Sequence, residues 1–265
     1  MKKFKTVIGA SLCLTLLFSF AACTPKSKME YKTPEGMLIA TLDSARMGEM
    51  SWEDFWEQHV SKITKKLDNF SKDLFVQEMS KKYPKLNYTS TLSLIERTDV
   101  DKNIFKVDLN YQTTNTTGQA NPKTVTEYVE YTGGEYKLIY DGIYNWKTYS
   151  LAEEPNALAV TKVDAKYRYG GYMLSFNFKN NDSVKNCVGY LKGAALSAVT
   201  TEGTYNSNFD VMYTVEAGQE LSVSATFPKM KGKLKEVTIS DVYLTDENGI
   251  IVSPGSGGKT IQFTV

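Results

Sequence analysis

The sequence predicts an α+β part followed by an all-β part. Apolar residues recur at helical spacing before Pro84, and beyond residue 90 they alternate with polar residues, as they do in strands. A polar stretch with one proline, 150–156, separates the first strands from a second run of strands. We therefore expect an α+β domain over 33–150 and a β-sandwich over 157–265.

Three short amphipathic helices are expected in the first part. Thr33, Pro34 and Glu35 supply an N-cap, a proline at the first helical position and an acid in the first turn. Ser51 offers a second cap, and a third apolar stripe ends before Pro84, which cannot continue a helix.

The strands follow from an apolar period of two. Phe105, Val107 and Leu109 alternate with polar residues without a break, and Gly133-Gly134 marks a hairpin turn. Beyond residue 157 several short strands are separated by turn residues, at a spacing typical of a sandwich.

The N-terminus carries the strongest functional signal. Lys2, Lys3 and Lys5 precede an apolar run over 7–20 that is shorter than the roughly 20 residues of a spanning helix. Residues 1–22 are therefore predicted to be an export signal, and a single-pass anchor is the alternative.

The four residues Phe20-Ala21-Ala22-Cys23 resemble the lipobox of bacterial lipoproteins, with Phe20 in place of the usual aliphatic residue. The resemblance implies that signal peptidase II recognises Phe20, Ala21 and Ala22 and that Cys23 carries lipid, including acyl chains such as palmitate. Two or more chains hold a protein stably on a membrane. The expected location is extracytoplasmic, anchored to the cell membrane by lipid on Cys23, with 23–32 as a tether. Ordinary secretion by signal peptidase I is the alternative.

Three short motifs mark the first part: TPE at 33–35, GE at 48–49 and GEYKL at 134–138. With the order of helices and strands, they resemble the cystatin-like fold of the nuclear transport factor 2 superfamily. The resemblance implies a conical pocket lined by aromatic side chains. The candidate lining residues are Tyr128, Tyr136, Tyr140 and Tyr144.

Two motifs mark the second part: FNFKNNDS at 176–183 and EAGQ at 216–219. They resemble strand ends and turns of Ig-like domains in Gram-positive lipoproteins, with Ala217 in place of the usual proline. The resemblance implies an Ig-like β-sandwich and a Gram-positive host. The cysteine and tryptophan pattern of an antibody domain is not present.

Composition argues against several functions. The chain has 31 basic and 30 acidic residues, so nothing favours a nucleic-acid partner. One histidine and three cysteines leave little for a zinc site, a histidine-based triad or a disulfide framework. We therefore expect no metal and no cofactor. His59 is interpreted as a helix-face residue and Cys187 as a buried structural cysteine.

The leading hypothesis is a non-enzymatic, lipid-anchored envelope protein that binds a small ligand or an envelope protein of unknown specificity. The alternative is an isomerase or dehydratase type of enzyme that uses a cystatin-like pocket. Asp108, on an alternating strand, is the one acid that we would test as its catalytic residue. A third hypothesis is an interaction protein that acts through the sandwich.

Overall fold

The structure is a computed structural model that describes residues 31–84, 90–114, 120–151, 157–246, 248, 250–251 and 258–265. The expected export signal and lipobox lie outside the described residues. The chain divides into two units, Met1–Lys32 and Thr33–Val265. Across the described residues, each helix is too short or too polar to cross a membrane.

The described residues contain four α-helices, all before Pro84: α2 (Pro34–Met47), α3 (Trp52–His59), α4 (Lys62–Lys65) and α5 (Lys72–Lys82). Each begins after a hydroxyl residue whose side chain accepts a hydrogen bond from the first turn. These N-caps are Thr33, Ser51, Ser61 and Ser71. Gly48 ends α2 in the left-handed conformation, with φ of 80°. The expected helix starts at Thr33 and Ser51 are confirmed.

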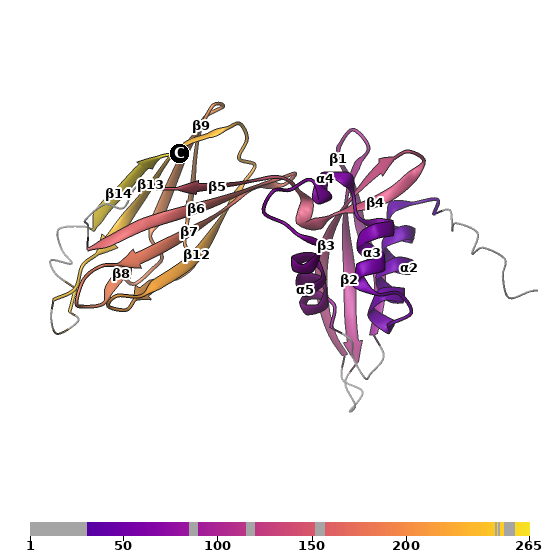
Figure 1. Cartoon of the computed structure of the whole chain (residues 1–265), viewed down its shortest axis with the longest axis horizontal. Helices are drawn as coiled ribbons and strands as arrows, with labels where there is room; N and C mark the ends of the chain where they lie inside the picture. The colour runs from indigo at the N-terminus through magenta and orange to yellow at the C-terminus, as the bar shows by residue number, and fades with distance from the viewer. Residues whose placement is uncertain are drawn as a thin grey trace, which may run out of the picture. The chain divides into compact units, whose positions relative to one another are not determined.

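The first sheet is an antiparallel meander of β1 (Ser90–Asp101), β2 (Ile104–Thr114), β3 (Ala120–Thr132) and β4 (Glu135–Ile139), in that order. Helices α2, α3 and α5 lie along it (Figure 1). Val107 and Leu109 are fully buried, and the polar residues between them are less buried, as the alternating pattern predicts.

The expected α+β cystatin-like domain is wrong. Strands form 54% and helices only 19% of the described residues, and the sheets are antiparallel. The motifs that suggested this fold are local: TPE at 33–35 caps and opens α2, Gly48 ends it, and 134–138 turns into β4. Because caps and hairpins recur in unrelated folds, these motifs specify local structure without specifying a family.

The remaining strands form two further antiparallel sheets. One has the order β12-β7-β6-β5, and the other has the order β10-β9-β13-β8-β11 with β14 paired to β13. The strands of the first are β5 (Ile143–Ser150), β6 (Leu158–Arg168), β7 (Gly171–Asn180) and β12 (Glu220–Pro228). Those of the second are β8 (Asn186–Val188), β9 (Ala195–Thr200), β10 (Thr204–Asn208), β11 (Tyr213–Val215), β13 (Leu234–Tyr243) and β14 (Lys259–Thr264).

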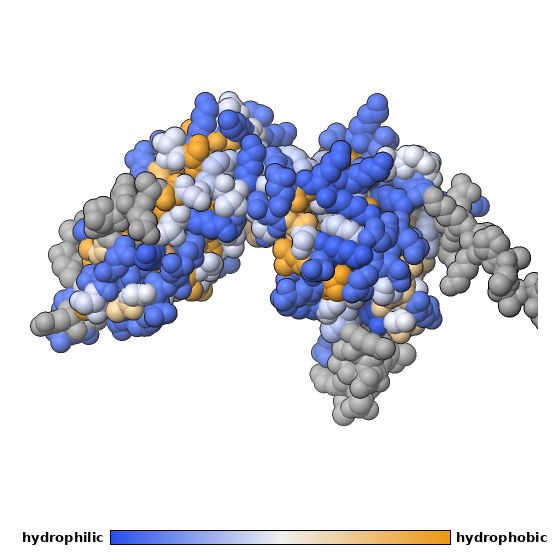
Figure 2. Space-filling model, in the orientation of Figure 1, coloured by the Kyte–Doolittle hydropathy of each residue, from blue (hydrophilic) through white to orange (hydrophobic). Residues whose placement is uncertain are grey.

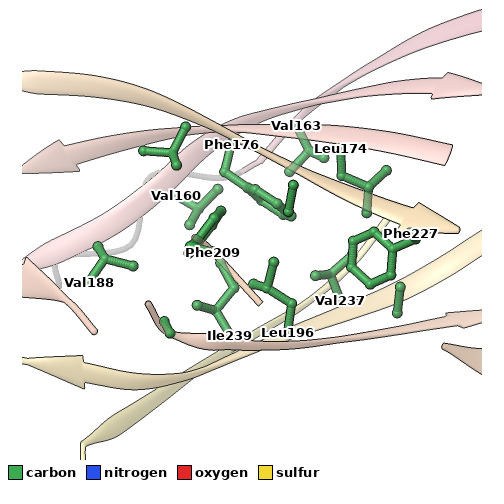
Figure 3. Packing of buried hydrophobic residues seen from close by; sticks show 14 of the residues in the cluster. Val160, Val163, Leu174, Phe176, Val188, Leu196, Phe209, Phe227, Val237 and Ile239 are labelled. Atoms are coloured by element: carbon green, nitrogen blue, oxygen red, sulfur yellow. The ribbon is translucent and has the colours of Figure 1, made fainter. Parts of the chain in front are cut away.

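The two sheets share one apolar core. Val163 and Phe176 come from one sheet, and Leu196 and Ile239 come from the other (Figure 3). Phe209, from the connection before β11, is fully buried among them. This arrangement is compatible with an Ig-like sandwich, and that name stays a prediction.

Strand β5 is paired with β6, for example through Tyr149 and Val163. The expected boundary at 150–156 therefore falls between two neighbouring strands of the same sheet. A short 3-10 turn, Tyr140–Gly142, connects β4 to β5. The division of the chain into two domains stays a prediction.

A buried amide organises one end of the sandwich. Asn180, from the FNFKNNDS motif, has no exposed surface and its side-chain NH2 donates to the carbonyls of Val184 and Val215, at 2.7 and 2.9 Å. Its oxygen accepts from the Asn186 side chain at 2.9 Å and from the Asp182 backbone at 3.0 Å. All of its hydrogen-bonding capacity is used inside the protein.

We expect Asn180→Ala to lower the free energy of unfolding by about 2–4 kcal/mol, because it leaves several buried polar groups without partners. Chemical denaturation measures this loss. Asn206 of β10 is exposed, so Asn206→Ala should change stability by no more than about 0.5 kcal/mol. Equal effects of the two variants would contradict this account of the motif.

Candidate functional site

The four candidate pocket tyrosines do not come together. Tyr140 stacks on Phe70 with ring centres 4.4 Å apart, inside the helix-covered part of the molecule. Tyr136 contacts Phe105 instead. The four tyrosines predicted from the sequence therefore do not line one common pocket. Of the four, only Tyr144 lines the groove described below.

Tyr128 and Tyr144 do share one neighbour. Their rings lie 6.4 and 5.1 Å from the ring of Tyr169, which follows β6. Tyr128 is buried, whereas Tyr144 is 40% exposed. Of this pair only Tyr144 offers a large surface to a ligand.

Asp108 is held in a local ion pair. Lys106 Nζ lies 2.7 Å from Asp108 Oδ2, and the Thr126 hydroxyl donates to Oδ1 at 2.5 Å. Burial by itself would raise the pKa of Asp108, but the hydrogen bonds and the ammonium charge outweigh it and lower this pKa. Asp108 is thus an ionised, paired carboxylate on the face opposite Val107 and Leu109.

His59 and Cys187 occupy the positions expected of structural residues. His59 ends α3, and its ring centre lies 5.4 Å from that of Phe55. Burial, assisted by the nearby charge of Lys137, lowers the pKa of His59 to about 4. Cys187 is buried in β8 as a free thiol, as predicted.

A groove of about 250 Å³ lies between the turn after α4 and the start of β5, and it is open to solvent. Its lining mixes apolar, aromatic and polar side chains: Ile63, Lys66, Leu67, Asp68, Tyr144, Asn145 and Trp146. On the face of the molecule drawn in Figure 2, apolar residues form small separate groups among polar ones. A concave site with a few polar groups is the usual form of a ligand site.

Aromatic packing holds the wall of the groove. Phe70, three residues after the lining residue Leu67, stacks on Tyr140 and lies 6.1 Å from the Trp146 ring. Phe75 of α5 supports Phe70 edge to face, with ring centres 6.4 Å apart. Such pairs add to the stability that burial provides. The groove is therefore built on a rigid base.

Lys166 completes the surroundings of Trp146. The two residues are directly opposite each other on β5 and β6. The Lys166 ammonium nitrogen lies 4.0 Å from the centre of the indole ring, a cation–π contact. Burial lowers the pKa of Lys166, because the charged form is partly removed from water.

A second polar cluster fastens α5 to β3. Glu127 has no exposed surface, and its Oε1 accepts from the Tyr83 hydroxyl and from Lys82 Nζ, both at 2.6 Å. Burial, followed by the charge of Glu127, raises the pKa of Tyr83 well above its ordinary value. The sequence analysis did not single out Glu127, although an acid that alternates in step with the apolar residues Val125 and Val129 indicates a buried carboxylate.

No family model matches the chain, and no curated protein matches it. Over the part of the chain that the structure describes, histidine, cysteine and acidic residues do not gather in a group of three or more that could hold a metal ion. The groove and the sequence of the N-terminus are therefore the features of the molecule that bear on its function.

The lowered pKa of His59 predicts a loss of stability in mild acid. The unfolded histidine binds a proton near pH 6.5 and the folded one only near pH 4. The contribution of His59 to the free energy of unfolding is therefore fully present above pH 6.5 and is lost as the pH is lowered toward 4. We expect this residue to account for on the order of 1–2 kcal/mol, after allowance for solvent screening.

The test compares the free energy of unfolding of wild type and His59→Gln at pH 7 and pH 4.5. The variant should lose less stability between the two values. Because His59 is the one histidine in the sequence, an equal loss in both proteins would assign the acid sensitivity to carboxylates instead.

Proposed function

We propose that this chain is a lipid-anchored extracytoplasmic protein of the cell envelope that binds a ligand through the groove beside Trp146. The anchor is supported by the sequence alone: the N-terminal lysines, the apolar run and the small residues before Cys23. The proposed partners are the membrane, through the lipid, and a small ligand or an envelope protein.

The groove is the observation that carries the binding function. Its lining includes the half-exposed ring of Tyr144 and its neighbours at the start of β5. Polar side chains from the turn after α4 line the same groove. Its volume of about 250 Å³ is below the roughly 300–1,000 Å³ of pockets that enclose drug-sized molecules. We infer that it takes one ring or a group of similar size, from a small molecule or from a larger ligand.

Two observations favour binding over the enzyme alternative. That alternative depended on a cystatin-like pocket, and the fold is mostly β. It also depended on Asp108, which is ionised and already bound by Lys106 and Thr126. A general base needs a pKa closer to the operating pH than such a carboxylate has.

Cell fractionation and crosslinking test the proposal together. A photoreactive phenylalanine at position 144 should give a discrete crosslinked product in living cells, and the protein should stay in the membrane fraction. Cys23→Ala should move it out of that fraction, because the acyl chains supply the stable attachment.

The matched control places the same photoreactive residue at Tyr131, which is 42% exposed and does not line the groove. Crosslinks of equal yield at 131 and 144 would exclude the groove as the specific site. A membrane fraction that Cys23→Ala leaves unchanged would exclude the lipid anchor.

A further inference from the structure

We propose that the groove recognises a small ligand through an anionic group, a carboxylate or a phosphate, which binds the Lys166 ammonium and the Trp146 indole N–H. This inference rests on the proposed function, because it takes the groove to be the binding site. It adds the chemical class of the ligand and the two residues that select it.

Lys166 is a cation whose hydrogen-bond donors are not used. Its closest partner is the π face of Trp146, which attracts the positive charge without accepting a conventional hydrogen bond. Among the described residues, Lys166 forms neither a hydrogen bond nor an ion pair. A partly buried ammonium whose N–H groups have no acceptor favours the binding of an anion.

The acids around Lys166 already have other partners. Asp164 is 3.0 Å from Lys162 Nζ, and Glu78 of α5 is 3.1 Å from Lys81 Nζ. Asp141 forms an ion pair with Arg168. These three carboxylates and Arg168 are the charged groups whose fields reach Lys166. Within the part of the chain that the structure describes, these acids are therefore engaged elsewhere, and none of them is in contact with the Lys166 ammonium.

Trp146 provides a second donor next to the first. Its indole nitrogen Nε1 is buried and has no hydrogen-bond partner in the described part of the protein. Buried donors in native proteins are nearly always paired, so this exception needs an explanation, and the one we propose is a ligand. Trp146 lines the groove, and the Lys166 ammonium, which is not itself a lining residue, lies over the ring of Trp146.

The chemistry of the two donors selects the ligand. A carboxylate or phosphate carries several oxygens that accept hydrogen bonds from an ammonium or an indole N–H, and hydrogen bonds between charged groups are stronger than neutral ones. At the rim, Lys66 adds positive charge and Asp68 adds negative charge. Ile63, Leu67 and Tyr144 then contact the apolar body of the ligand.

The partial burial of Lys166 is consistent with this role. Burial lowers its pKa, and the charges of Asp141, Asp164 and Glu78 offset the loss of hydration only in part. A bound anion would reverse this effect by favouring the charged amine.

Indole NMR of the full chain tests the inference. The three tryptophans, 52, 56 and 146, give three indole N–H signals, and Trp146→Phe assigns the one of interest. The probes are benzoate, phenyl phosphate and the neutral benzyl alcohol. We expect benzoate or phenyl phosphate to move the Trp146 signal saturably, and benzyl alcohol to bind at least about tenfold more weakly. Comparing the two anions distinguishes a carboxylate from a phosphate ligand.

Lys166→Met keeps the aliphatic chain over the indole and removes the charge, so it should weaken anion binding by at least about tenfold. Lys147→Met is the matched control: it removes one exposed lysine next to Trp146 on the same strand and should change the affinity less than about twofold. The signals of Trp52 and Trp56 report whether each variant is folded.

Equal affinity for benzoate and benzyl alcohol, or an unchanged affinity in Lys166→Met, would overturn the anionic class while the groove remained a binding site. If none of the three probes moved the Trp146 signal, the anionic class would be equally wrong. The crosslink from position 144 decides separately whether the groove binds a ligand at all.

Discussion

The stacking of Phe70 on Tyr140 is the contact on which the candidate site depends. Phe70 lies in the turn between α4 and α5, and Tyr140 lies between β4 and β5. Their rings, 4.4 Å apart, join the helices to the point where the chain leaves the first sheet. Phe75 supports the stack from α5 and Trp146 borders it on β5. This packing and the hydrogen bond from the Tyr140 backbone N–H to the Thr64 hydroxyl, at 3.0 Å, together fix the two walls of the groove relative to each other.

Some charged groups in the described residues are paired with a group of opposite charge, and others are not. Glu127 is buried and its charge is paired with Lys82 through Oε1, although its Oε2 has no hydrogen-bond partner among the described residues. Asp108 is bound by Lys106 and Thr126. These groups stabilise local packing and need no ligand. Lys166 differs because its partner in the described residues is an aromatic ring. Because of this contrast, we propose that the ligand binds beside Trp146 rather than at Glu127 or Asp108.

Local structure could be predicted from the sequence, whereas the fold family and the site could not. Thr33 and Ser51 cap helices because a hydroxyl at that position satisfies the first backbone N–H groups, wherever the helix packs. The cystatin-like fold was inferred from such local motifs and was wrong. Trp146 and Lys166 are twenty residues apart and meet only because β5 pairs with β6 across the polar stretch at 150–156. The pairing of these two strands depends on the tertiary structure, and the sequence around either residue does not predict it.

The most direct measurement of the central contact is the stability and the Trp146 indole signal of Phe70→Ala. Phe70 is 4% exposed, so the account predicts a loss of about 3–5 kcal/mol in the free energy of unfolding and a displaced Trp146 signal. Phe105→Ala, at a less buried phenylalanine of β2, should cost less than about 2 kcal/mol and leave that signal in place. A Phe70→Ala protein that loses less than about 1 kcal/mol and keeps the Trp146 signal would show that the groove does not depend on this stack.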